Sequence, residues 1–245
     1  MATLGLSYQE LYNDVSRFLG TYGSSGPTGT DLTDAQSAVH AGYRKFLDSN
    51  PVGWSFLKRT DEKITTVSNT YTYELPKDFV SLVGTFQFGA DQTYGPLSEI
   101  SVDMIRDWKA VNDYNSYPTH FAMTAGNYHA ETGQTWNVLF YPTPDSAYTL
   151  HFAYRFYPPK LSNATDVPAG PLDVAECIRQ CCLAEAETYL DENTGIQETK
   201  AKELMLIAIR NDLKRQPKTL GYYGNRVTSS LTRGDYRTEN VVYNT

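Results

Sequence analysis

The chain is poor in cysteine and histidine, with three cysteines and four histidines among 245 residues. Cys177, Cys181 and Cys182 all fall within one predicted helix. Because neighbouring cysteines on one helix cannot join distant parts of a fold, the sequence predicts no disulfide framework. Free cysteines of this kind fit a reducing compartment.

Signatures of catalysis and of metal binding are also missing. Cys182 lies on the apolar stripe of its helix, where a cysteine usually packs as a small hydrophobic residue. The glycine-rich segment 20–29 lacks the Lys-Ser/Thr ending of a phosphate-binding loop. The four histidines are His40, His120, His129 and His151. They do not have the spacing of zinc ligands, and they lie far from the cysteines in the chain. We therefore predict no enzyme, catalytic residue, metal site or cofactor.

The sequence offers no long apolar run and little positive charge. The longest apolar run is far shorter than the ~20 residues that a membrane-spanning helix needs. The first ten residues lack the basic start and apolar core of a signal peptide, so we expect a soluble cytosolic product. The net charge of -7 argues against nucleic-acid binding through a broad basic face.

Two helices are predicted before the strands. Ser7 and Glu10 have the spacing of a capping box, followed by an apolar face as far as Leu19. Thr33 and Gln36 repeat this spacing and predict the start of a second helix. That helix should end before Pro51.

Two more helices are predicted in residues 171–214. The turn between them is Asp191 to Gly195, which predicts an antiparallel helical hairpin. From Leu204 to Ile209 the second helix is apolar nearly all round, so we expect it to be covered on several sides.

Between the helical pairs the apolar period changes to two, which is typical of strands. Residues 63–67 and 71–75 flank a Ser-Asn turn and predict a hairpin, and residues 80–88 predict another strand. Alternation on both sides of the turn at 142–145 predicts a second hairpin, with Trp136, Phe152 and Phe156 buried. A short helix capped by Ser101 is expected over residues 102–111.

The predicted fold class is therefore α+β, with an insertion. Residues 1–58 and 158–216 should form a four-helix bundle from the N- and C-terminal helices. Residues 59–157 should form an inserted antiparallel β-sandwich-like domain, and residues 217–245 an extended C-terminal arm.

The arm differs in composition from the acidic body that precedes it. It gives no sustained pattern of helix or strand, so it is either a disordered tail or an arm that orders on a partner. Tyrosine and arginine are enriched at interface hot spots, which favours the arm. Its candidate contact residues are Tyr222, Tyr223, Arg226, Arg233, Tyr236, Arg237 and Tyr243.

Several short motifs occur in a defined order along the chain. They are Asn-Pro-Val-Gly-Trp-Ser-Phe-Leu (50–57), Tyr-Glu-Leu-Pro-Lys-Asp-Phe (73–79), Tyr-Pro-Thr-His-Phe-Ala (117–122), Val-Leu-Phe-Tyr-Pro-Thr-Pro-Asp (138–145) and Leu-Ala-Glu-Ala-Glu-Thr-Tyr-Leu-Asp-Glu (183–192). The ordered set resembles the head-to-tail adaptor (connector) proteins of tailed bacteriophages, from about Leu6 to Tyr223.

The resemblance implies a structural virion protein that is made in the host cytoplasm and lies in the virion neck. Twelve copies would form a ring beneath the portal protein, with C-terminal arms docked on the portal and a downstream tail or nozzle protein on the other side. DNA would pass through the lumen without specific binding, since an acidic body avoids holding phosphates. The acids that we expect to face this channel are Glu185, Glu187, Asp191 and Glu192.

Two other functions compete with the adaptor. A stopper or tail-terminator ring would lie further down the tail and bind a tail protein instead of the portal. A carbohydrate-binding or hydrolytic tail domain would use Trp136, Tyr154 and paired acids, but sugar stacking needs exposed aromatic rings, whereas alternation predicts that Trp136 is buried.

Overall fold

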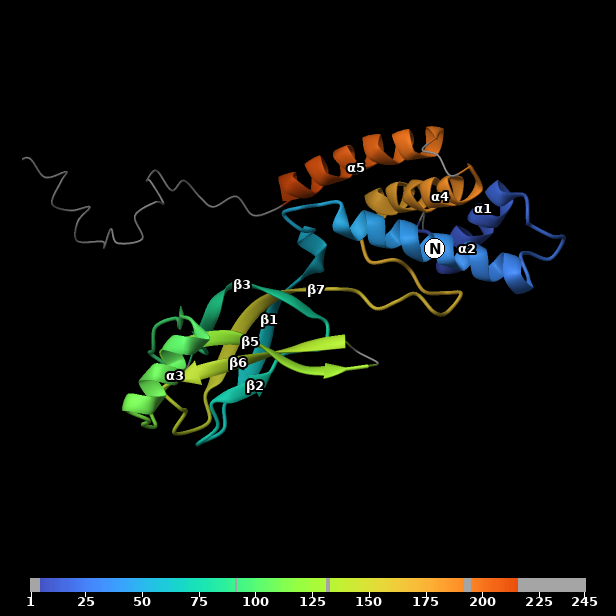
Figure 1. Ribbon diagram of the computed structural model, residues 1–245. Coiled ribbons are helices and arrows are strands. Elements are labelled where there is room, and N and C mark those ends of the chain that lie inside the picture. The colour runs from blue at the N-terminus through green and yellow to red at the C-terminus, as the bar shows by residue number, and fades with distance from the viewer. Residues whose placement is uncertain (1–4, 91, 131–132, 192–194, 216–245) are drawn as a thin grey trace, which may run out of the picture.

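The computed structural model of the chain describes residues 5–90, 92–130, 133–191 and 195–215. It confirms the α+β class: within these residues there are five α-helices and two β-sheets. Helices α1, α2, α4 and α5 lie together at one end of the molecule, and the strands lie with α3 at the other end (Figure 1). No helix in the described ranges has the length and apolarity needed to cross a membrane.

The helical region combines two segments of the chain. α1 (Tyr8–Leu19) and α2 (Gly29–Asp48) precede the strands, and α4 (Ala175–Asp191) and α5 (Ile196–Arg215) follow them. α4 packs against the other three helices. α2 and α4 approach very closely at Gly42, where a Cβ would lie 2.4 Å from the Cα of Cys182. The missing side chain is therefore what permits this contact.

The two predicted capping boxes have different outcomes. At α1 the Ser7 hydroxyl accepts from the Glu10 backbone N–H, and the Glu10 side chain accepts from the Ser7 N–H, as predicted. The box at Thr33 is wrong, because α2 begins at Gly29 and Thr33 lies inside it. There the Thr33 hydroxyl donates to the Gly29 carbonyl at 3.2 Å, a common bond for threonine within a helix.

The strands form two sheets. One has the order β1-β7-β3, from Lys58–Thr65, Thr149–Phe156 and Phe79–Phe88. The other has the order β2-β6-β5-β4, from Thr72–Glu74, Gly133–Tyr141, His120–His129 and Ser98–Glu99. Neighbouring strands are antiparallel except β4 and β5. The strand predicted at 80–88 is present as β3.

Both predicted hairpins are wrong in their pairing. β1 pairs with β7 and β2 with β6, so the first two strands lie in different sheets. β6 and β7 are likewise separated between the sheets, while β6 pairs with β5, a strand that the sequence did not indicate. The two turns therefore carry the chain from one sheet to the other.

One aromatic core lies between the two sheets. Phe86 of β3 contacts Phe121, Phe140 and Phe152, with ring centroids 4.9, 5.4 and 5.0 Å away. α3 (Val102–Val111), with the predicted cap at Ser101, buries Ile105 against β5 and β6.

Trp136 corrects a predicted core position, because its side chain is 37% exposed. Its backbone is nevertheless flanked on both sides, since it pairs with Ala125 of β5 and its carbonyl accepts from the Leu75 N–H at 2.8 Å. Phe152 is buried as predicted, and Phe156 is half-buried.

The junction between helices and strands is built around Trp54. Its buried ring stacks between Phe46 and Phe56, with centroids 4.6 and 5.5 Å away. Its indole N–H donates to the last carbonyls of α2, those of Phe46 and Leu47. The motif at 50–57 therefore ends α2 and directs the chain into β1.

Candidate functional site

The cysteines have no nucleophilic character. All three are free and buried. The hydrogen bond with Cys177 and burial both raise the pKa of Cys181, and burial raises the pKa of Cys182. A raised pKa disfavours the reactive thiolate at Cys181 and Cys182, and all three cysteines fill the core, as predicted for Cys182.

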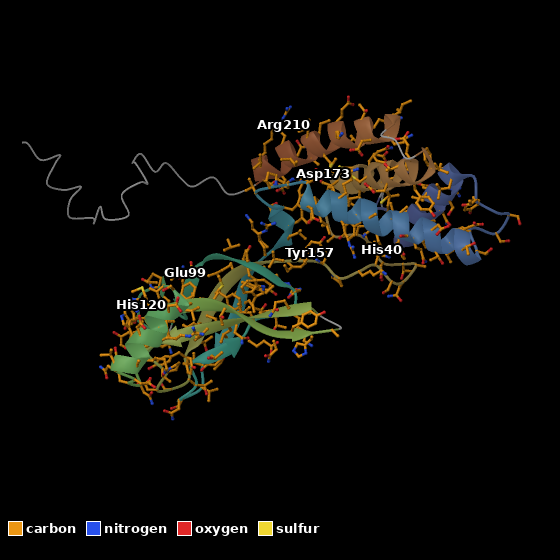
Figure 2. The ribbon with its side chains drawn as sticks, in the orientation of Figure 1. His40, Glu99, His120, Tyr157, Asp173 and Arg210 are labelled. Carbon is orange, nitrogen blue, oxygen red and sulfur yellow. The ribbon has the colours of Figure 1, made fainter. Side chains whose placement is uncertain are left out.

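Three of the four histidines, His40, His120 and His151, have hydrogen-bond partners close to them in separate regions. His40 Nε2 lies 3.0 Å from the Tyr8 hydroxyl among the helices, and burial lowers its pKa. His151 Nδ1 lies 2.7 Å from the Asp61 carboxylate on the sheet containing β1. Figure 2 shows His40 among the helices and His120 in the strand region. Within the described residues, no group of three or more His, Cys, Asp or Glu side chains could hold a metal ion.

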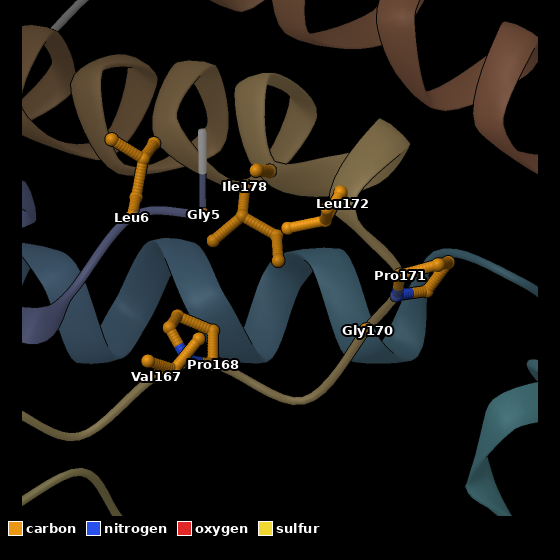
Figure 3. Close-up of a pocket in the computed structure, with 9 residues that line it drawn as sticks. Gly5, Leu6, Val167, Pro168, Gly170, Pro171, Leu172 and Ile178 are labelled. Carbon is orange, nitrogen blue, oxygen red and sulfur yellow. The ribbon is translucent and has the colours of Figure 1, made fainter. Parts of the chain in front are cut away.

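The best-enclosed pocket in the described part of the chain has no catalytic groups. It lies beside the start of α4 (Figure 3) and has a volume of about 20 Å³, enough for roughly one water molecule. Its lining has no titratable side chain: Gly5, Leu6, Val167, Pro168, Gly170, Pro171, Leu172, Ala175 and Ile178.

Two of the four acids predicted to face a channel have structural contacts inside the subunit. Glu185 accepts from Lys45 Nζ at 2.8 Å. The Glu187 carboxylate accepts from the backbone N–H groups of Gln197 and Glu198, at 2.8 and 3.3 Å, and so caps α5. The Asp191 side chain and Glu192 lie outside the described residues, so the channel role of all four stays a prediction.

Lys45 joins three helices. Its ammonium group, on α2, binds Glu185 of α4 and also Glu198 of α5, at 2.5 Å. The hydrogen bond from Lys45 lowers the pKa of the buried Glu198 carboxyl against the opposing effect of burial. Sequence reasoning missed this network, because Lys45 lies 140 and 153 residues from its two partners in sequence.

The predicted arm residues, from Tyr222 to Tyr243, lie outside the described residues. Its attachment point is described. Arg215, at the end of α5, donates to both carboxylate oxygens of Asp173, at 2.6 and 3.1 Å. The Asp212 carboxylate accepts from the backbone N–H of Ser55 at 3.0 Å and from its hydroxyl. These contacts hold the last turn of α5 beside the chain segments that lead into and out of the strands.

The sequence predicted that α5 is covered on several sides, but one of its apolar sides is exposed within the subunit. Ala201, Met205 and Ala208 are buried, but Leu206 and Ile207 are 65% and 52% exposed. Figure 2 shows Arg210 pointing away from the other helices. We define the α5 outer face as eight of the exposed residues of this helix: Ile196, Lys200, Glu203, Leu206, Ile207, Arg210, Leu213 and Lys214.

The carbohydrate hypothesis receives mixed support from these side chains. Trp136 is exposed, which removes the main sequence argument against sugar stacking. Tyr154, its suggested partner, is fully buried, and its hydroxyl donates to Asp78 at 3.0 Å. The two rings therefore cannot form one stacking surface.

An α+β subunit with an exposed apolar helix face, and with no clustered reactive groups in its described ranges, is typical of an assembly protein. The sequence model of one family, described as SU10 adaptor protein, matches residues 6–230. The chain therefore belongs to the SU10 adaptor protein family, which confirms the resemblance to phage adaptors. A search of curated proteins found no match.

Proposed function

We propose that the chain is a head-to-tail adaptor that joins the portal to the tail in the virion neck. Twelve copies form a ring that encloses part of the DNA channel. The family match over residues 6–230 carries this proposal, because it includes every described helix and strand as well as the start of the C-terminal segment.

The arrangement of the chain supports a separate role for each of its three parts. We assign residues 1–58 and 158–216 to a four-helix bundle that builds the ring. Residues 59–157 are a sandwich-like insert, and residues 217–245 are the portal-binding arm. The enclosed aromatic core supports an insert that holds its own shape and presents a surface to the next tail protein.

The attachment of α5 supports the arm assignment. Because Arg215 and Asp212 fix the last turn of the helix, the arm starts from a defined place on the subunit. The Tyr and Arg side chains from Tyr222 to Tyr243 would then add contacts along the portal, as exposed aromatic and guanidinium groups do at interfaces.

The acidic character of the chain supports passage of DNA. A net charge of -7 repels phosphates and limits the counterion release that would hold DNA in the lumen. We assign Asp191 and Glu192, at the turn after α4, to the channel lining together with Glu185 and Glu187.

The test is co-expression of the full chain with the portal protein of the same phage. We expect twelve adaptor copies on one portal ring, from native mass measurement and electron micrographs. Replacing Tyr222, Tyr223, Arg226 and Arg233 by alanine should abolish the complex and leave the circular dichroism spectrum unchanged. The matched control is Arg106→Ala on the exposed side of α3.

Two results would contradict the proposal. Portal binding that survives the arm substitutions would disprove the role of the arm. A ring that does not bind the portal but binds a tail protein would instead identify a stopper or tail terminator.

A further inference from the structure

The α5 outer face has more exposed apolar surface than is usual for a helix that faces solvent. Leu206, Ile207 and Leu213 are 65%, 52% and 46% exposed, and they surround Arg210. Contiguous exposed apolar side chains of this kind mark interaction sites in soluble proteins. The question is which surface covers them.

A second exposed helix face has the opposite character. On α2 the buried residues Ala35, Val39 and Phe46 face α4, and the other side is exposed. We define the α2 outer face as Asp31, Asp34, Ser37, Ala41, Arg44 and Asp48. Its middle residues, Ser37 and Ala41, are small, so large side chains of another helix can approach closely there.

The two faces differ in charge. The α5 outer face has three basic side chains, Lys200, Arg210 and Lys214, against one acid, Glu203. The α2 outer face has three acids against one base, Arg44. A basic face attracts acidic surfaces and disfavours basic ones. The α2 outer face is such an acidic surface on the same chain.

The spacing of these residues also matches. Lys200, Ile207 and Lys214 recur every seven residues on α5, and Asp34, Ala41 and Asp48 do so on α2. Residues seven apart lie on one side of a helix, and both sets span about 21 Å. α2 and α5 run in the same direction, with α4 between them (Figure 1). A small rotation from one subunit to the next therefore keeps the two helices nearly parallel.

We propose that the α5 outer face of one copy packs on the α2 outer face of the next copy. Ile207 lies against Ala41, Lys200 lies beside Asp34, and Lys214 lies beside Asp48. The apolar contact supplies most of the affinity, since exposed ion pairs contribute little, and the charges select the register. A contact between two different faces repeats around a closed ring. The inference rests on the ring of the proposed function and adds the surfaces that build it.

Disulfide trapping in the full chain tests the pair at the centre. Ile207→Cys and Ala41→Cys proteins are mixed in equal amounts at high concentration and exposed to a mild oxidant. Because the native cysteines are buried, they do not compete. We expect about ten times more covalent dimer than from Val111→Cys mixed with Ala41→Cys, since a disulfide needs Cβ atoms within about 4.5 Å. Val111 is 89% exposed on α3 and serves as the matched control.

A charge exchange tests the register independently. Lys214→Glu in the Ile207→Cys chain should reduce trapping several-fold, and Asp48→Lys in the Ala41→Cys chain should restore it. No restoration would overturn the register. Trapping no better than the control, or efficient dimers of Ile207→Cys alone, would overturn the interface.

The outcomes separate this inference from the proposed function. Intact rings on the portal without the 207–41 disulfide would refute these surfaces and leave the adaptor role in place. Absence of any ring, with or without portal, would refute the adaptor role itself.

Discussion

The helical region and the strand region are held together by different means. Six of the ten buried residues between the sheets are aromatic, and Phe86 alone contacts three other rings. Between α2 and α4 the closest contact has no side chain on one partner, at Gly42. Two ion pairs of Lys45 also join α2 to α4 and to α5. Both cores bury apolar volume, but the strand core is mainly aromatic, whereas the helical core adds a close backbone contact and buried charge.

The largest effect should follow from removing volume between the sheets. Phe86→Ala leaves a cavity at the centre of the aromatic cluster and should cost about 3–5 kcal/mol in the free energy of unfolding. Chemical denaturation followed by circular dichroism measures the loss. Tyr128→Ala, at a side chain that is 73% exposed, is the control and should change the free energy by less than about 0.5 kcal/mol. Equal losses would show that the rings do not form a packed core.

Adding volume should be the damaging change between the helices. Gly42→Ala places a methyl group 2.4 Å from the Cα of Cys182, so the helices must separate, at a cost of about 1–3 kcal/mol. Elsewhere within a helix, replacing glycine by alanine normally stabilises by about 0.5–1 kcal/mol. The sign of the change in stability therefore shows whether the two helices are in close contact. Gly95→Ala is the control, because nothing lies within 4 Å of its added Cβ. Thermal denaturation that shows a more stable Gly42→Ala protein would disprove the close contact.

Removing charge should weaken the helical region in a way that depends on pH. Glu198→Gln should cost about 1.5–3 kcal/mol at pH 7, the usual value for a hydrogen bond to a charged group. The hydrogen bond from Lys45 lowers the pKa of Glu198 in the folded chain, so its contribution is present above the unfolded pKa of about 4.3. That contribution is lost as the pH falls through the folded value.

The difference between wild type and Glu198→Gln should therefore shrink below about pH 4.3. Urea denaturation at a series of pH values measures it. The exposed acid in Glu203→Gln provides the control and should show a small difference at every pH. A gap that widens in acid would contradict the assigned ion pair.

The smallest effect should come from the contact between the last turn of α5 and the segment that leads into β1. Ser55→Ala removes the hydroxyl donor to Asp212 and should cost about 0.5–1.5 kcal/mol. Hydrogen exchange should quicken at the last turn of α5 and remain unchanged between the sheets. Ser24→Ala, in an exposed loop, is the comparison. Faster exchange throughout both regions would mean that the bond supports the whole fold.

Local signals in the sequence predicted the helices well. The caps at Ser7 and Ser101 and the break between Asp191 and Gly195 depend on neighbouring residues, and the structure places helix boundaries there. The start of α2 was misplaced because Thr33, a residue typical of caps, forms its bond inside the helix.

Strand partners could not be predicted by the same reasoning. Alternation indicates which side of a strand is apolar, but not which strand lies beside it. β1 pairs with β7, from Lys58 with Arg155 to Thr65 with Thr149, so its partner lies about ninety residues away in the chain. Trp136 has the correct alternation and pairs with Ala125 of β5, yet its side chain is exposed, because strand pairing does not decide which side chains are covered.

The candidate surfaces were partly visible in the sequence. The run from Leu204 to Ile209 showed that α5 needs cover, but not that Leu206 and Ile207 lack it within one subunit. The capping role of Glu187 had no local signal, because it acts across the turn on the first N–H groups of α5.

The strand region enters and leaves the helical region at adjacent points, since Lys58 and Arg155 are paired across β1 and β7. Neighbouring antiparallel strands are about 5 Å apart, so a tight turn could replace the whole excursion without moving α2 or α4. Evolution can therefore exchange, enlarge or delete this module while the helices keep their contacts with one another. A related chain can change the surface of the strand module in this way without redesigning the helical core.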